Sequence, residues 1–136
     1  MNILTIAAAF GAIALSVPAV AHDGQTETVV PKFDQAITNI PGKSLVVVEV
    51  DYAPGAVSPS HTHAPSAFIY AYVLSGEIVS KVNDEEVRTY KAGEGWYETP
   101  NARHEISRNA SATEPAKLLA VFVVDTDDKP LTTPVK

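Results

Sequence analysis

The sequence of 136 residues contains no cysteine. A chain without cysteine cannot form a disulfide framework, a thiolate zinc site, an iron–sulfur cluster or a cysteine nucleophile. Basic residues are also few: 10 Lys and Arg stand against 16 Asp and Glu, which gives a formal net charge of -6. Because a nucleic-acid partner requires a basic surface, none is expected. Metal or catalytic chemistry in this chain must therefore use imidazole and oxygen groups.

Proline and glycine recur along residues 22–136, so few uninterrupted stretches are long enough for a helix. Between these breaks lie runs rich in β-branched and aromatic residues, which favour strands. The runs are 45–52, 68–74, 78–82, 87–90 and 118–124. We predict an all-β sandwich or small barrel of short strands, with 78–82 and 87–90 forming a hairpin and 118–124 buried on both faces.

The first 21 residues carry no charged side chain and end in Ala19-Val20-Ala21, the small-residue pattern that signal peptidase recognises. An uncleaved membrane anchor is the competing interpretation, but Pro18 and the short apolar stretch favour cleavage. We predict a signal peptide over 1–21, cleaved after Ala21, and a secreted or periplasmic product with no membrane association. The expected organisation is then an N-terminal segment with the first strand over 22–44, a barrel over 45–126 and a C-terminal tail over 127–136.

Three histidines stand in contexts that suit a metal site. His61 and His63 are two residues apart, so on an extended strand both imidazoles leave the same face. His104 follows about forty residues later, beyond the segment from Gly93 to Pro100, where another strand can supply a third ligand. The spacing alone also fits solvent-exposed histidines in a loop, so the choice between a metal site and an exposed loop depends on the surrounding sequence.

That surrounding sequence resembles the cupin superfamily. The first cupin motif is G-x5-H-x-H-x3,4-E-x6-G, and the second is G-x5-P-x-G-x2-H-x3-N. The matched positions are Gly55, His61, His63 and Gly76 in the first motif, and Gly93, Pro100 and His104, in outline, in the second. The resemblance covers roughly residues 46–125 and implies a double-stranded β-helix, the jelly-roll barrel of antiparallel strands. It also implies that the three histidines bind a metal ion.

The chain departs from the family pattern at the metal-binding glutamate. Counting back from Gly76, that position holds Ile69, and no acid occurs from residue 61 to residue 75. Glu98, six residues before His104, is the acid best placed to restore a carboxylate, either as a ligand or as a group that orients an imidazole. In the alternative interpretation Glu98 is a solvated residue at the barrel mouth. The Pro100 turn breaks the strand alternation between Glu98 and His104, so the sequence leaves both open.

Two functions follow as hypotheses from the resemblance. The first is a dioxygenase-type oxidoreductase in which His61, His63 and His104 hold one divalent transition metal (Fe, Mn, Zn, Ni or Cu), and a small organic substrate enters the barrel. The alternative is a non-catalytic module that binds a small ligand or a metal. Many cupins are dimers, so the resemblance also implies a homodimer. Alternation places Phe68, Tyr70 and Tyr72 on the face opposite Ile69, where they would pack against a second sheet or a partner.

Overall fold

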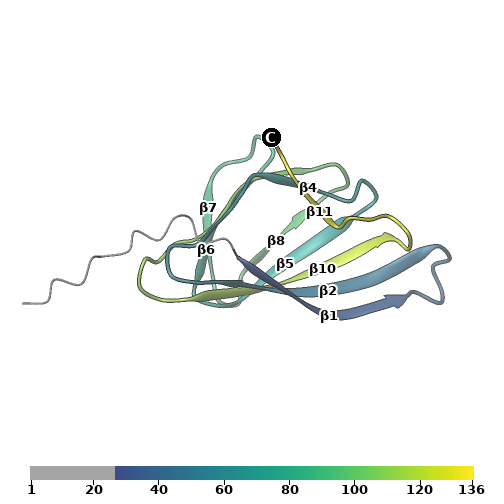
Figure 1. Ribbon diagram of the computed structural model, residues 1–136, viewed down its shortest axis with the longest axis horizontal. Helices are drawn as coiled ribbons and strands as arrows, with labels where there is room; N and C mark the ends of the chain where they lie inside the picture. Colours follow the sequence, from purple (N-terminus) through teal and green to yellow (C-terminus); the bar gives the residue numbers. More distant parts are fainter. Residues whose placement is uncertain (1–26) are drawn as a thin grey trace, which may run out of the picture.

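The computed structural model describes residues 27–136 (Figure 1). The predicted signal peptide over 1–21 and its cleavage site lie outside the described residues. Within 27–136, no helix is long and apolar enough to cross a membrane.

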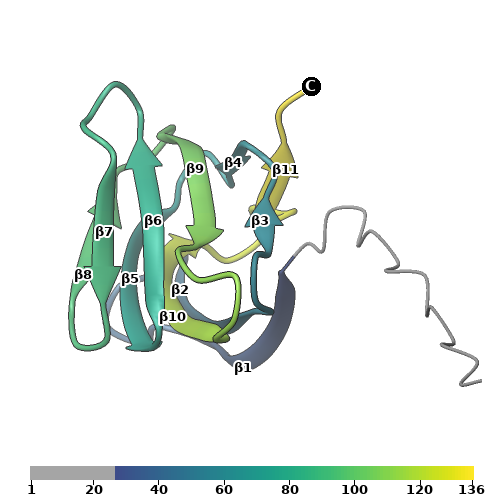
Figure 2. The same cartoon turned by 90° about the vertical axis from the view of Figure 1, so that its left-hand side faces the viewer.

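The described residues form strands and turns without a helix. The strands are β1 (Thr28–Ala36), β2 (Lys43–Tyr52), β3 (Val57–Ser58), β4 (His61–His63), β5 (Phe68–Ser75), β6 (Glu77–Val82), β7 (Arg88–Lys91), β8 (Gly95–Glu98), β9 (Arg103–Asn109), β10 (Ala116–Asp125) and β11 (Thr132–Pro134). They pair antiparallel in two sheets, with orders β1-β2-β10-β5-β8 and β11-β4-β9-β6-β7, while β3 pairs with β9. The sheets lie face to face with their strands curving around a common interior (Figure 2). The predicted all-β jelly roll is confirmed.

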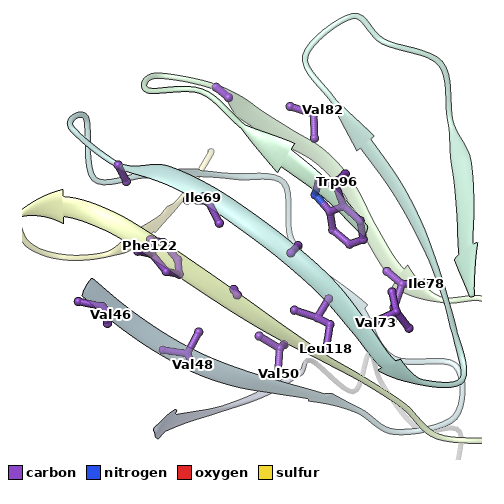
Figure 3. Close-up of a cluster of buried hydrophobic side chains, with 14 of the residues drawn as sticks. Val46, Val48, Val50, Ile69, Val73, Ile78, Val82, Trp96, Leu118 and Phe122 are labelled. Carbon is purple, nitrogen blue, oxygen red and sulfur yellow. The ribbon is translucent and has the colours of Figure 1, made fainter. Parts of the chain in front are cut away.

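Regular alternation in β2 and β10 builds the first wall of the interior. Every second residue of both strands is buried, and the residues between them are half-buried apart from the exposed Asp125 at the end of β10. Val46, Val48, Leu118 and Phe122 all point into the interior (Figure 3). Burying one such side chain stabilises the fold by about 1.5–3 kcal/mol. The prediction that 118–124 is buried on both faces is wrong, because β10 is central in its sheet but the outer face of that sheet is only partly covered.

The second sheet carries the predicted hairpin and both segments that contain the candidate histidines. Strands β6 and β7 pair with Ile78 opposite Tyr90, as expected for the hairpin. Strand β4 lies between β9 and β11. The segment 127–136, expected as a tail, therefore contributes a strand: Thr132 is the register partner of His63, and Pro134 that of His61.

Aromatic side chains cover part of the outer face of the first sheet. Phe68, Tyr70 and Tyr72 on β5 are exposed, as is Tyr97 on the neighbouring strand β8. The rings of Phe68 and Tyr97 stack with their centroids 5.8 Å apart. Alternation thus places these rings opposite buried Ile69, as predicted, but no second sheet of the described chain covers them.

Candidate metal centre

The three predicted histidines meet on the inner face of the second sheet. His61 and His104 are register partners across β4 and β9, and His63 follows His61 on the same side of β4. The ring centroid of His61 lies 4.8 Å from that of His63 and 4.9 Å from that of His104. One nitrogen from each ring lies within 4.8 Å of the others, so the cluster is able to hold a metal ion.

Backbone carbonyls orient two of the imidazoles. Nδ1 of His61 lies 2.8 Å from the Pro59 carbonyl oxygen, and Nδ1 of His63 lies 3.1 Å from the Leu131 carbonyl oxygen. A carbonyl oxygen can only accept, so each Nδ1 carries the proton and donates it. In the neutral ring, Nε2 then presents a lone pair toward the cluster. Metal-ligating histidines are held in the same way, by donating the other ring N–H to a carbonyl or carboxylate.

Glu98 restores a carboxylate to the site from an unexpected strand. It lies on β8 directly opposite Ile69 of β5, the position at which the family pattern has its glutamate. Paired residues in an antiparallel ladder project to the same side of the sheet. Glu98 therefore enters the interior beside Ile69 and is only 3% exposed, so the interpretation of a solvated residue at the barrel mouth is wrong.

The Glu98 carboxylate faces two of the histidines. Its Oε1 lies 3.1 Å from Nδ1 of His104 and accepts a hydrogen bond from Nε1 of Trp96 at 3.2 Å. Its Oε2 lies 3.3 Å from Nε2 of His63 but has no hydrogen-bond partner. Burial acts to raise the pKa of Glu98, but a hydrogen bond that His63 donates when its Nε2 is protonated, the charges of His104 and His63, and the Trp96 hydrogen bond outweigh burial and lower the pKa to about 2. Glu98 is thus a buried anion at neutral pH.

Oε2 of Glu98 and Nε2 of His63 together test whether the residues fit a metal. The His63 proton is on Nδ1, where Leu131 accepts it, so a lone pair on Nε2 faces a carboxylate oxygen without a partner. Two electron-rich atoms at this separation are satisfied only when a cation, either a proton or a metal ion, lies between them. Imidazole and carboxylate are also the ligand types that suit Zn, Fe, Mn, Ni and Cu. The donor set fits a divalent transition metal.

His104 is the most enclosed of the three imidazoles. Its Nε2 lies 2.8 Å from the Ser80 hydroxyl, and its ring packs edge-on against Trp96. Burial lowers the pKa of His104 to about 4, and burial also lowers the pKa of His61. Both rings are neutral at pH 7, which is the state that binds a metal.

A cavity of about 100 Å³ opens beside the cluster. Inward residues of the first sheet form one wall, among them Val48, Ala71, Leu118 and Phe122, and the three histidines of the second sheet lie across from them. Glu98 also lines the cavity. A cavity of about 150 Å³ accepts benzene, so this one suits a ligand of a few non-hydrogen atoms. The sequence did not identify Ser80, the Leu131 carbonyl or the cavity itself, because each depends on how distant strands pair.

Fold and site together define a jelly-roll barrel with a histidine cluster beside an interior cavity. The sequence model of the Cupin domain family matches residues 48–122, and the chain belongs to the cupin superfamily.

Similar proteins are found among curated sequences and solved structures. "Germin-like protein subfamily 2 member 2" of Arabidopsis thaliana is 30% identical over 112 residues, which are 79% of this chain and 50% of that protein. An "uncharacterized conserved protein with double-stranded beta-helix domain" from Klebsiella pneumoniae has a TM-score of 0.63 at 20% identity, covering 84% of this chain and 88% of that one. Oxalate oxidase in complex with glycolate has a TM-score of 0.61 at 21% identity, covering 80% and 55%. The chain spans about half the length of the curated relatives it matches.

Proposed function

We propose that this cupin is a metal-dependent oxidoreductase of dioxygenase type that acts on a small organic molecule in the barrel. His61, His63 and His104 hold one divalent transition metal (Fe, Mn, Zn, Ni or Cu), and Glu98 completes the site. The unpartnered Oε2 of Glu98 facing the His63 lone pair is the single observation that carries this proposal. When bound, the metal supplies open coordination positions and Lewis acidity for substrate and oxygen.

The protein's own residues prepare this chemistry. The Pro59 and Leu131 carbonyls fix the rings of His61 and His63, and Trp96 holds the Glu98 carboxylate by its Oε1. The cavity walls around the cluster are mostly apolar, and apolar surroundings strengthen electrostatic interactions relative to bulk water. The likeness to oxalate oxidase supports an oxidoreductase.

Metal content is the direct test of the site. We expect protein purified without a His-tag and reconstituted separately with Fe, Mn, Cu, Ni and Zn to hold about one equivalent of at least one metal, measured by elemental analysis. Less than about a tenth of an equivalent with every metal overturns the metal proposal.

Glu98→Gln tests the carboxylate separately. The substitution keeps the size of the side chain, removes the negative charge that faces His63 and His104, and replaces one acceptor oxygen by an NH2 donor. Since loss of a group that orients or completes a metal site costs about 10–100-fold in metal affinity, we expect a drop of that size in competition titrations with a chelator. Glu105→Gln on β9 is the matched control, because Glu105 pairs with Arg103 away from the cluster and its variant should bind as the wild type does. Equal affinity of the Glu98 and Glu105 variants contradicts a role for Glu98.

A non-catalytic binding module is the alternative function. Ile69 in place of the family glutamate favours such a module, but Glu98 lies opposite Ile69 and returns a carboxylate to the site. Oxygen uptake by metal-loaded protein with a panel of small thiols, phenols and diketones separates the two. Uptake that depends on both metal and substrate supports the oxidoreductase, whereas no uptake by fully loaded protein supports the module.

We further propose that the protein is exported, with a signal peptide over 1–21 cleaved after Ala21. The apolar start of the chain and its A-x-A end support this proposal. Mass spectrometry of protein from the exported fraction should give an N-terminus at His22, and an intact Met1 contradicts the cleavage.

A homodimer is the oligomeric state that the outer aromatic face favours. Contiguous exposed apolar residues such as Phe68, Tyr70 and Tyr97 commonly mark an interaction surface. Sedimentation velocity should give a species of twice the chain mass, and a monomer at all concentrations contradicts this state.

A further inference from the structure

A second carboxylate, that of Glu27, reaches the cavity from the residue just before β1. Glu27 lines the same cavity as His61, His63 and Glu98. Its Oε2 is buried and has no hydrogen-bond partner among the described residues. A buried carboxylate oxygen without a partner is costly, so its presence at a cavity wall indicates a place for a ligand's hydrogen-bond donor.

The strand register explains how Glu27 comes to this position. Thr28 pairs with Asp51 across β1 and β2, so the register continued by one residue sets Glu27 opposite Tyr52. Cross-strand partners project to the same side, with Cβ atoms about 5 Å apart. Tyr52 points inward and is 3% exposed, and it lines the cavity as Glu27 does. Burial, and to a smaller extent the charges of Glu27 and Glu98, raise the pKa of Tyr52, which keeps its hydroxyl protonated.

Tyr52 belongs to a cluster of three buried hydroxyls. Its oxygen lies 2.7 Å from the Ser107 hydroxyl and 3.3 Å from the Ser58 hydroxyl, and all three residues line the cavity. Three hydroxyls carry three donor protons, and two bonds within the cluster use two of them. Among the described residues, one O–H donor is therefore left without an acceptor on the wall of the cavity that Glu27 also lines. A ligand hydroxyl, which both donates and accepts, matches this pair of groups.

The charges around the cavity oppose an anionic ligand. Glu27 and Glu98 both line it, and no Lys or Arg is among its lining residues. The two carboxylates carry two negative charges when both are ionised, and a bound divalent ion balances them. A carboxylate ligand would make the site negative again, and like charges inside a low-dielectric cavity repel strongly.

Building on the proposed metal function, we propose that Glu27 and the hydroxyl cluster of Tyr52, Ser58 and Ser107 form a specificity subsite. This subsite binds the hydroxyl group of a small neutral molecule, whose other oxygen binds at the metal. It disfavours carboxylate ligands, the class to which oxalate belongs. The small cavity restricts the ligand to a few non-hydrogen atoms.

Hydroxyacetone and pyruvate are matched probes for this subsite, since they share a methyl ketone and differ in carrying a hydroxymethyl group or a carboxylate. Their dissociation constants are measured by ligand-observed NMR on zinc-loaded and metal-free wild type, Glu27→Gln and Glu77→Gln. We expect the wild type to bind hydroxyacetone at least about tenfold more tightly than pyruvate, and Glu27→Gln to reduce that preference at least about tenfold by removing the repulsion. Glu77→Gln removes the same charge from an exposed position and should keep the wild-type preference.

The results distinguish this proposal from the metal proposal. Zinc content of the same samples reports the metal site, while the change in probe preference between wild type and Glu27→Gln reports the subsite, with or without zinc. Pyruvate binding as tightly as hydroxyacetone to the wild type overturns the subsite, as does an unchanged preference in Glu27→Gln. Unchanged thermal unfolding of Glu27→Gln is expected and verifies that the barrel is intact.

Tyr52→Phe is a second variant that tests the hydroxyl cluster. It should weaken the binding of hydroxyacetone and leave the binding of pyruvate unchanged, and equal weakening of both contradicts the role of the hydroxyls.

Discussion

The double variant His61→Ala/His104→Ala is expected to lose metal binding altogether, with less than about a tenth of an equivalent bound where the wild type binds about one. His61 and His104 are register partners on the adjacent strands β4 and β9, so the variant removes one ligand from each of the two strands that carry the cluster. His63 and Glu98 alone leave an ion with two protein ligands, which is fewer than the three or four that protein sites of such metals use. Elemental analysis after reconstitution is the measurement.

The control for this variant lies on the same strand. Arg103 and Glu105 flank His104 on β9 and form an ion pair outside the barrel. Arg103→Ala/Glu105→Ala therefore changes two residues of β9 without entering the cluster, and it should retain about one equivalent of metal. Metal retained by the histidine variant contradicts the assignment of the site. Metal lost from both variants would instead indicate that the substitutions disrupt β9. A cooperative unfolding transition of each variant shows independently whether the fold is intact.

The histidines could be predicted from the sequence because their signals are local. The spacing of His61 and His63 requires only that the segment be extended, and Gly93 to His104 keeps the spacing of a family motif. The structure places both segments on adjacent strands, as that reasoning expects. Gly76, also a motif position, has a φ of +70°, and a Cβ there would lie 2.6 Å from the Pro115 carbonyl oxygen. Backbone requirements of this kind are visible in sequence because only glycine meets them.

Glu98 could not be assigned from the sequence because its role depends on strand pairing. Its nearest histidine in sequence, His104, is separated from it by the turn after Thr99, where Asn101 adopts a φ of +65° and resets the alternation. The decisive relation is between Glu98 and Ile69, which are 29 residues apart and become neighbours only in the β5–β8 ladder. The strand β11 was missed for a similar reason. Three residues that include a proline carry little strand signal, and the pairing with β4 forms at long range.

Metal-free protein is expected to lose about 3 kcal/mol of stability as the pH falls from about 6.5 to about 4. The reason is His104, whose pKa burial lowers from 6.5 to about 4 in the folded state. In this pH range the unfolded chain binds a proton at His104 and the folded chain does not. Stability therefore rises with pH across the window, is fully present above about pH 6.5, and is lost as protonation pulls the chain toward the unfolded state. Urea unfolding at a series of pH values measures this loss.

Two other groups shape the same profile. Burial lowers the pKa of His61 as well, so its contribution has the same sign and steepens the loss below pH 6.5. Glu98, with its pKa lowered to about 2, adds a further loss only below about pH 4.5, because its ionised form is the one the fold favours. His104→Gln should flatten the profile between pH 6.5 and 4 by removing the largest titration in that range. Stability of the metal-free wild type that stays constant or increases as the pH falls through this window contradicts the buried, neutral state of His104.

A bound divalent metal competes with protons for the same imidazoles, so loading the protein with metal should add stability at pH 7 and make the loss of stability on acidification steeper.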